Sequence, residues 1–287
     1  MTDYKIGVML DGFRQPLFEA IHTAAAVGAD ALQLTAVGGE KSPLDMSRAE
    51  RRELLDRVRS EGLCISAVCG DLGGHGFTLA SENEKKIEIS KRIMELAAEL
   101  DTKVVTTHIG VIPADKSGCY GTMLDACGRL GEFAESLGGC FAIETGPETP
   151  EVLSEFIDEL GTDGIAVNYD PANLVMVTGA DPVAGVHTLS GKIAHTHAKD
   201  GIMLKKTEPK VIYDFFAEGG IGDLRMEDYF RELPLGSGSV DINAWVKALC
   251  DTGYRGYITV EREVGADPVG DIRLAVEFLR NIFASMQ

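Results

Sequence analysis

Short apolar runs alternate with longer amphipathic stretches along the whole chain. Each run is rich in Val, Ile and Ala and is continuously apolar rather than alternating, which is typical of strands buried on both faces. The eight strands that this pattern predicts are residues 6–10, 31–35, 64–69, 104–107, 140–143, 165–169, 193–196 and 257–260.

Apolar residues at helical spacing fill the stretches between these strands. Residues 47–50 read Ser-Arg-Ala-Glu, a capping box that starts a helix, and Gly161 follows another helix as a C-cap. The eight predicted helices are residues 16–27, 47–60, 81–100, 120–137, 149–160, 180–190, 241–251 and 267–283.

Strict alternation of strands and helices implies parallel pairing through right-handed crossovers. Eight such units in 287 residues match an α/β fold with one domain, the (β/α)8 TIM barrel, which typically takes ~250 residues plus insertions. An open doubly wound sheet is the main alternative. It is disfavoured because no Gly-x-Gly-x-x-Gly sequence follows the first strand.

One segment, residues 201–238, breaks this alternation between the seventh strand and its helix. Structureless loops of that length inside a domain are uncommon and usually functional. The aromatic residues Phe215, Phe216, Tyr229 and Phe230 lie in it. The insert is equally compatible with a lid over the barrel mouth and with a helical excursion packed on the barrel rim. Its aromatic residues also offer a surface for a homo-oligomer.

The charge balance limits the classes of partner. The chain has 27 Lys and Arg against 45 Asp and Glu, a formal net charge of −18. We therefore expect no nucleic-acid partner and no docking on anionic lipid, because both need a cationic surface. No apolar run reaches the roughly 18 residues of a membrane span, and no signal-peptide pattern is present. The six cysteines form no Cys-x-x-Cys pair, so we expect reduced, mostly buried thiols in a cytoplasmic protein.

Four consecutive predicted strands end in residues that can bind a cation. In a TIM barrel the functional residues lie at the carboxyl ends of the strands. Here these ends carry Glu144, Asp170, His197 and Glu261. Adjacent strand ends lie ~5 Å apart, so the four side chains can converge. Any one of the acids could instead be an N-cap or a salt-bridge partner, but four in register favour one site.

Three converging carboxylates repel one another unless protons or a cation neutralise them. One imidazole with three carboxylates is a nitrogen and oxygen donor set without thiolate. Such a set suits one divalent metal ion, with Mn²⁺ first and Mg²⁺, Co²⁺ or Zn²⁺ also compatible.

Other polar residues near the strand ends are candidates for substrate binding. Asp71 lies in a glycine-rich turn after the third strand, and His108 ends the fourth, where it could also be satisfied locally. The segment from Gly236 to Asp241, Gly-Ser-Gly-Ser-Val-Asp, precedes a predicted helix. It could bind a phosphate at the helix N-terminus, or it could simply be a loop with an N-cap.

Three further candidates lie beside the predicted metal ligands. His195 lies two residues before His197, on the same side of the strand but deeper, where it could support the ligands or pack inside the barrel. Lys199 and Arg262 closely follow ligand candidates. Either could bind an anionic or hydroxylated substrate or neutralise the acidic site.

At these residues the chain resembles the xylose isomerase-like TIM barrel family of sugar isomerases and epimerases, over nearly its whole length. The segments that carry the resemblance are Ile-Glu-Thr at 143–145, Tyr-Asp-Pro-Ala-Asn at 169–173, His-Thr-His-Ala-Lys-Asp at 195–200, Leu-Gly-Ser-Gly-Ser-Val-Asp at 235–241 and Gly-Tyr-Ile-Thr-Val-Glu-Arg at 256–262. The resemblance implies one divalent metal bound by Glu144, Asp170, His197 and Glu261. In ketose 3-epimerases of this family the two glutamates also move protons on either face of the substrate. Glu144 and Glu261 would then be catalytic, with the metal holding a cis-enediolate.

The chain departs from the family pattern in two places. Relatives often carry a histidine three residues after the aspartate of the sixth strand, where this chain has Asn173, which we count among the substrate-binding candidates. Endonuclease IV, a distant relative, needs a trinuclear cluster with additional histidines, most of which are absent here. The negative charge agrees, so a role in DNA repair is rejected.

The leading hypothesis is a metal-dependent isomerase or epimerase of a sugar or sugar phosphate, which abstracts a proton next to a carbonyl. A lyase or dehydratase acting on a polyol or glycoside would use the same metal and bases. A third hypothesis is a non-catalytic sugar-binding barrel. The intact set of four metal ligands counts against it, although a fold alone never proves an activity.

Overall fold

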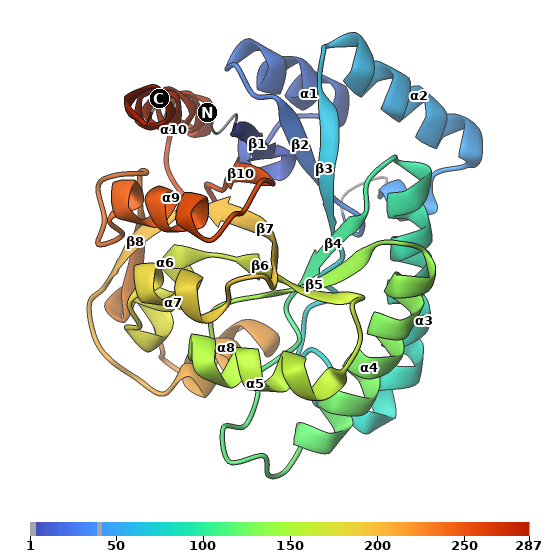
Figure 1. Cartoon of the computed structure of the whole chain (residues 1–287), viewed down its shortest axis with the longest axis vertical. Helices are drawn as coiled ribbons and strands as arrows, with labels where there is room; N and C mark the ends of the chain where they lie inside the picture. The colour runs from blue at the N-terminus through green and yellow to red at the C-terminus, as the bar shows by residue number, and fades with distance from the viewer. Residues whose placement is uncertain (1–3, 39–41, 287) are drawn as a thin grey trace.

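The computed structural model describes residues 4–38 and 42–286, and its parallel strands close into a barrel surrounded by helices (Figure 1). Around the barrel the strands follow the order β1, β10, β7, β6, β5, β4, β3, β2, and each neighbouring pair is parallel. The predicted (β/α)8 TIM barrel is therefore confirmed. Its strands are β1 (Lys5–Met9), β2 (Ala31–Thr35), β3 (Cys64–Cys69), β4 (Val104–Thr107), β5 (Cys140–Glu144), β6 (Ile165–Tyr169), β7 (Ile193–Ala198) and β10 (Tyr257–Val260).

The eight predicted helices are all present, within two residues at each end. The capping box forms, since the Glu50 backbone N–H donates to Ser47 Oγ and Glu50 Oε2 accepts from the Ser47 N–H. Gly161 ends its helix in the left-handed conformation, with φ of 63°. These helices are α1 (Leu17–Ala26), α2 (Arg48–Ser60), α3 (Ala80–Glu99), α4 (Tyr120–Ser136), α5 (Pro150–Leu160), α7 (Pro182–Thr188), α9 (Ile242–Asp251) and α10 (Pro268–Ser285).

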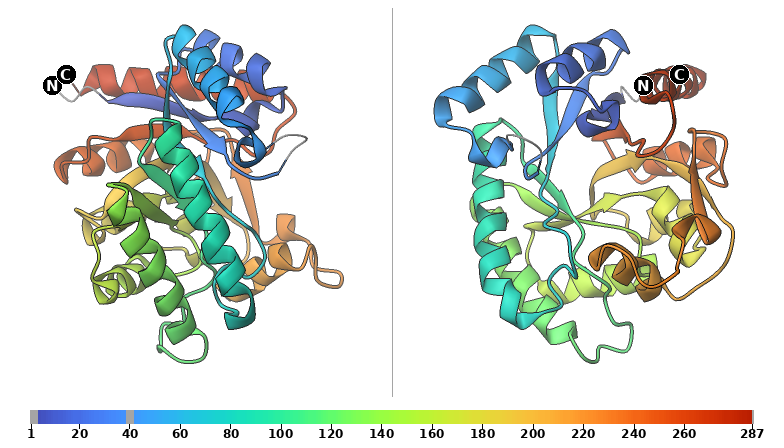
Figure 2. Two further views of the ribbon diagram at one scale, coloured as in Figure 1. Left: turned by 90° about the vertical axis from the view of Figure 1, so that its right-hand side faces the viewer. Right: turned by 180° about the vertical axis from the view of Figure 1, so that it is seen from behind.

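The insert has a structure of its own and projects from one end of the barrel (Figure 2, orange). Strands β8 (Asp200–Met203) and β9 (Phe230–Leu233) pair antiparallel at its base, and α8 (Pro209–Ala217) lies between them. A helical excursion was one of the two interpretations of this segment, but the two strands were not predicted, because they are short and are joined by a long excursion rather than a turn. Smaller elements also not predicted are η1 (Leu10–Phe13), η2 (Pro43–Asp45), α6 (Pro171–Asn173), the π-helix η3 (Leu174–Thr178) and η4 (Met226–Asp228).

The inside of the barrel changes from apolar to polar toward the site. Large apolar side chains such as Phe141 and Trp245 are fully buried between strands and helices. Toward the carboxyl ends, however, five strands each contribute a fully buried polar residue, namely Gln33, Thr106, Asn168, His195 and Thr259. Buried polar side chains cost free energy unless they are hydrogen-bonded, so these five residues need hydrogen-bond partners among their neighbours.

Two expectations from composition can be compared with the structure. Among the residues that the structure describes, no helix is both long and apolar enough to cross a membrane. The cysteines are less deeply buried than predicted, since only Cys127 is fully buried and the other five are partly exposed.

Candidate metal centre

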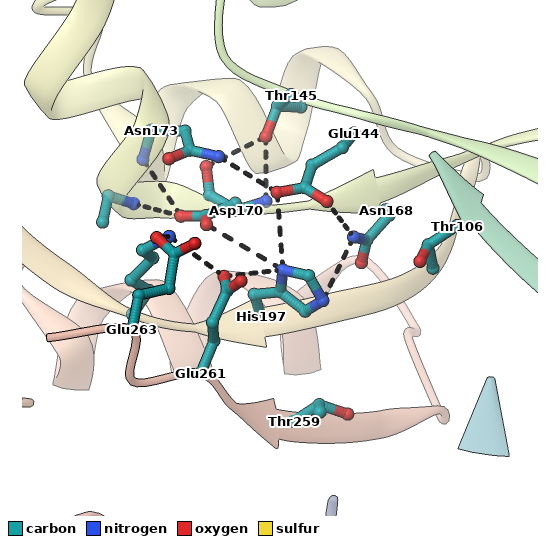
Figure 3. A network of polar contacts seen from close by, with 12 residues as sticks. Thr106, Glu144, Thr145, Asn168, Asp170, Asn173, His197, Thr259, Glu261 and Glu263 are labelled. Carbon is teal, nitrogen blue, oxygen red and sulfur yellow. Dashed lines mark hydrogen bonds and ion pairs between the residues drawn. The ribbon is translucent and has the colours of Figure 1, made fainter. Parts of the chain in front are cut away.

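Glu144, Asp170, His197 and Glu261 come together at the carboxyl ends of β5, β6, β7 and β10 (Figure 3). One ligand atom from each residue lies within 4.8 Å of the other three. His197 Nδ1 lies 2.9 Å from Glu261 Oε2, 3.5 Å from Glu144 Oε1 and 3.9 Å from Asp170 Oδ2. All four side chains are buried, and Asp170 is completely so.

Three of these converging atoms have no hydrogen-bond partner among the described residues. They are Asp170 Oδ2, His197 Nδ1 and Glu261 Oε2, of which the last two face each other at 2.9 Å as an ion pair without the geometry of a hydrogen bond. A buried polar atom without a partner costs roughly 1–3 kcal/mol, and native proteins contain few of them. A divalent cation would satisfy all three atoms at once, and the donor set of one imidazole and three carboxylates suits such an ion. The residues present therefore fit a metal.

Hydrogen bonds aim the two carboxylates of β5 and β6. Asp170 Oδ1 accepts the backbone N–H groups of Ala172 and Asn173, which caps α6 and leaves Oδ2 facing the other ligands. Glu144 accepts one side-chain amide on each oxygen, from Asn173 and from Asn168, both at 3.0 Å. Both carboxylates are thus held in place before a metal binds.

Two buried amides contact His197 on the side away from the carboxylates. Gln33 Oε1 lies 3.0 Å and Asn168 Nδ2 3.3 Å from His197 Nε2, and Gln33 Nε2 donates to Thr106 Oγ1. These contacts fix the ring so that Nδ1 faces the three carboxylates, and with a hydrogen on Nε2, which the Gln33 oxygen accepts, Nδ1 is the atom free to bind a metal. The sequence analysis missed Gln33 and Asn168. The available signal was an amide inside an otherwise apolar strand.

Two candidates for substrate binding lie outside the cavity lining. His195 lies inside the barrel, with Nδ1 2.9 Å from Asn168 Oδ1 and Nε2 3.0 Å from Thr259 Oγ1. Arg262 donates to Glu232 at 2.6 Å and to Asp271 at 2.8 Å. Because both side chains are held by these contacts with other residues of the chain, neither lines the cavity.

The other four candidates do line a cavity of about 1160 Å³ that opens above the metal ligands. Asn173 contacts Glu144, as described above. Asp71 Oδ2 lies 3.0 Å from His108 Nδ1, and His108 Nε2 lies 3.6 Å from Glu144 Oε1. Lys199 Nζ is 2.5 Å from Glu263 Oε2 and 3.3 Å from Glu261 Oε2.

Burial and mutual attraction shape the charges at this centre. Burial raises the pKa of Asp170 well above its usual value, and the nearby Glu261 and Glu144 add to this. Burial also opposes both charges of the Glu261–His197 pair, but their attraction holds the pKa of Glu261 well below and that of His197 well above the usual range. Partial burial opposes the charge of His108, yet Glu144 and nearby Asp71 raise its pKa to about 10. The centre is an acidic cluster that attracts cations.

The glycine-rich segment at 236–241 is a loop with an N-cap, not a phosphate site. The Asp200 carboxylate accepts the backbone N–H groups of Gly236, Gly238 and Val240 at 2.8–3.1 Å. A Cβ at Gly238 would lie 2.2 Å from Asp200 Oδ1, so this approach requires glycine. Asp241 caps α9 through the Ala244 N–H. Of the two interpretations, the loop with an N-cap is confirmed.

Known proteins share this architecture. The uncharacterized protein MJ1311 of Methanocaldococcus jannaschii is 26% identical over 245 residues, which cover 79% of this chain and 73% of that protein. A D-psicose 3-epimerase structure with D-fructose superposes with a TM-score of 0.73 at 17% identity, covering 97% of this chain and 99% of the other. The probable 3-DHS dehydratase AsbF of Bacillus anthracis superposes with a TM-score of 0.75 at 18% identity, covering 96% and 98%.

At such identities the two structures show a shared fold and no more. The family assignment comes from a sequence model described as xylose isomerase-like TIM barrel, which matches residues 21–282. That range includes all four candidate metal ligands and nearly every strand of the barrel. The chain therefore belongs to the xylose isomerase-like TIM barrel family.

Proposed function

We propose that this protein is a divalent-metal-dependent isomerase or epimerase of a sugar or sugar phosphate, with Mn²⁺ as its metal. One observation carries the proposal. Asp170 Oδ2, His197 Nδ1 and Glu261 Oε2 are buried, lack hydrogen-bond partners among the described residues, and meet beside Glu144 at the floor of a large cavity.

A divalent cation at this position would polarise a substrate carbonyl and acidify the hydrogen on the adjacent carbon. Glu144 would take that proton, leaving the C–H electron pair delocalised toward the carbonyl oxygen. For an epimerase, Glu261 would take up a proton from water and deliver it to the same carbon from the opposite side of the centre. Exchange with water then restores the two carboxyl groups to their starting states.

Neighbouring residues support these roles. Asn168 and Asn173 fix both oxygens of Glu144, so its orientation does not depend on the substrate. Lys199, 3.3 Å from Glu261 Oε2, stabilises the carboxylate form of that residue. His108, held by Asp71, faces the cavity beside Glu144 and is placed to donate a hydrogen bond to a substrate oxygen.

The test uses Mn²⁺-loaded protein and a panel of ketoses and ketose phosphates in D₂O, followed by NMR. An epimerase incorporates solvent deuterium at one carbon without losing water. Release of water or an alcohol would instead favour the lyase. Metal binding without exchange on any sugar would favour the non-catalytic barrel.

Glu144→Gln should lower the exchange rate at least 10³-fold, because it removes the proton acceptor while the neighbouring amides remain. Circular dichroism and thermal melting check that the variant folds. Glu151→Gln, an exposed glutamate at the start of α5, is the matched control and should keep full activity. Exchange that survives either metal removal or Glu144→Gln would contradict the proposal.

A further inference from the structure

We infer that the substrate is an uncharged, carbonyl-bearing sugar derivative with an apolar substituent, such as an aryl or alkyl glycoside whose ring carries a keto group, rather than an unsubstituted sugar or a sugar phosphate. The inference rests on the proposed function and narrows its substrate. The metal centre at the floor of the cavity takes the sugar, and the outer wall takes the substituent.

The cavity is larger than a single sugar ring needs. Its volume of about 1160 Å³ exceeds the ~300–1,000 Å³ that is typical of pockets for drug-sized ligands. A monosaccharide held at the floor by the metal ligands, Asn173 and His108 would leave most of this volume to water. The outer part therefore fits a second portion of the substrate.

The outer wall is apolar. Leu79, Phe216 and Val264 are 40%, 60% and 47% exposed, and all three line the cavity. They are three of the eight large hydrophobic side chains that are exposed among the described residues, so exposed apolar surface gathers at this mouth. The Phe216 ring centroid also lies 6.5 Å from that of Phe230, which lines the cavity as well. Clustered exposed apolar side chains mark binding sites.

The insert holds this apolar wall over the metal centre. A Cβ at Gly146, two residues after Glu144, would lie 2.2 Å from Tyr213 Oη, so α8 contacts the loop after β5 directly. The Tyr213 ring also lies 5.9 Å from the His108 ring. On the other side, His75 Nε2 lies 2.7 Å from Glu218 Oε1, which joins the loop after β3 to the end of α8. Floor and wall thus belong to one site.

The charges of the cavity disfavour a phosphate. Its lining includes seven Asp and Glu residues against two lysines and one arginine. Lys199 is paired with Glu263, and Lys210 Nζ lies 2.5 Å from Asp214 Oδ2. His108 lies between Asp71 and Glu144, at 3.0 and 3.6 Å. Arg231 is exposed and has no ion pair with another described residue, so among the lysines and arginines of the lining a phosphate could find one free cation at most. An anion would meet net repulsion here.

The backbone site for a phosphate is also taken. TIM barrels often bind phosphate in the loops after the seventh and eighth strands, where backbone N–H groups face the ligand. Here the loop at 236–241 follows β7 and the insert, and its backbone N–H groups donate to the Asp200 carboxylate instead. The substrate therefore gains nothing from carrying a phosphate.

The test compares matched probes on Mn²⁺-loaded protein by calorimetry or competition NMR. The probes are methyl and phenyl glycosides of glucose, galactose and mannose, together with the 6-phosphates of the same sugars. For at least one sugar, the phenyl glycoside should bind at least tenfold more tightly than the methyl glycoside, which is about 1.4 kcal/mol. The 6-phosphate should bind more weakly than its uncharged parent.

A variant pair links this preference to the wall. Phe216→Ala should reduce the ratio of phenyl to methyl affinity at least threefold. Phe18→Ala makes the same change at a phenylalanine that is 41% exposed on α1, outside the cavity, and should leave the ratio unchanged. Light scattering should give one mass for all three proteins. A mass change in Phe216→Ala alone would assign the wall to a second copy of the chain.

Equal affinities within every pair, no binding of any phenyl glycoside, or tighter binding of a 6-phosphate would each overturn the inference. These measurements need no turnover, so they are separate from the proposed function. Aryl preference without deuterium exchange on any carbonyl sugar would remove the proposed function only. Exchange on free ketoses with no aryl preference would remove this inference only.

Discussion

Two regions of the molecule each bury an aspartate, and the two carboxylates differ in how many hydrogen bonds they accept. Asp200, at the base of the insert, accepts two backbone N–H groups on each oxygen. Asp170, at the metal centre, accepts two on Oδ1 and none on Oδ2. Both residues are at most 1% exposed, so burial does not distinguish them. The fully bonded carboxylate fastens a loop, whereas the half-bonded one leaves an oxygen without a hydrogen-bond partner among the described residues, as a metal ligand would require.

A third buried acid completes the comparison. Neither carboxyl oxygen of Glu148 has a hydrogen-bond partner among the described residues, and burial raises its pKa to about 8. A buried carboxylate must be neutralised by hydrogen bonds, a cation or a proton. Asp200, Asp170 and Glu148 correspond to these three solutions, and a substitution that keeps the shape but removes the charge should affect each differently.

The largest effect is expected for Asp170→Asn, in the affinity for Mn²⁺. The asparagine can still cap α6 through its oxygen, but an amide nitrogen replaces the ligand atom Oδ2. The dissociation constant for Mn²⁺ should rise at least 10³-fold, about 4 kcal/mol. Titration calorimetry measures it. The metal-free variant should unfold no more easily than the metal-free wild type, because a neutral amide costs less to bury beside Glu144 and Glu261 than a carboxyl group that can ionise.

Asp181→Asn is the matched control for this change. Asp181 also precedes a proline and caps its helix, α7, by accepting the N–H groups of Val183 and Ala184, but it is exposed and outside the centre. Its variant should bind Mn²⁺ as the wild type does. Unaltered affinity in Asp170→Asn would mean that the unpaired oxygen is not a ligand.

The next effect is expected for Glu148→Gln, in the pH dependence of stability. The unfolded chain loses this proton near pH 4.5, and the folded chain near pH 8. Between these values the unfolded state binds fewer protons, so stability falls as pH rises, by at most ~1.4 kcal/mol per pH unit. The contribution is fully present below pH 4.5 and lost above pH 8. Glu148→Gln removes this loss and should stabilise the protein by about 4 kcal/mol at pH 8.

Urea unfolding at pH 4.5, 6.5 and 8 tests this prediction by measuring the free energy of unfolding at each pH. The variant and the wild type should be similar at the lowest pH and diverge as the pH rises. Glu151→Gln, at an exposed position three residues away, should follow the wild type throughout. A wild-type curve that stays flat between pH 4.5 and 8 would show that Glu148 is charged in the folded protein and has a partner.

The barrel could be predicted from the sequence because its signals are local. Each strand is a continuous apolar run, and each helix carries its own period and caps, as the capping box at Ser47 shows. The convergence of the four candidate metal ligands could be predicted for the same reason, since each lies at the end of a run and the parallel register brings these ends together. The insert could not be predicted, because β8 and β9 are short and pair only through a distant return of the chain.

The hydrogen-bond and ion-pair partners of individual side chains could not be predicted from the sequence. The spacing that put His195 beside His197 could not show that Asn168 and Thr259 take both ring nitrogens of His195. Arg262 follows a ligand in sequence, but it turns toward Glu232, which comes from the insert. The partner of each side chain depends on which donors and acceptors lie next to one another in the folded state. Tertiary packing decides this, and a local sequence pattern does not show it.

The smallest of the three effects is expected for Asp200→Asn, and it should appear in stability alone. The amide offers one oxygen for four N–H groups, so two donors of the loop lose their acceptor, at a net cost of about 2 kcal/mol. Hydrogen exchange should speed up at Gly236, Gly238 and Val240, while the Mn²⁺ affinity stays within twofold of the wild type. Asp241→Asn is the control, because asparagine caps a helix about as well as aspartate. A loss of Mn²⁺ affinity in Asp200→Asn as large as that in Asp170→Asn would mean that the loop and the metal centre form one unit. The number of unpaired oxygens on a buried carboxylate would then not tell whether the residue fastens a loop or binds a ligand.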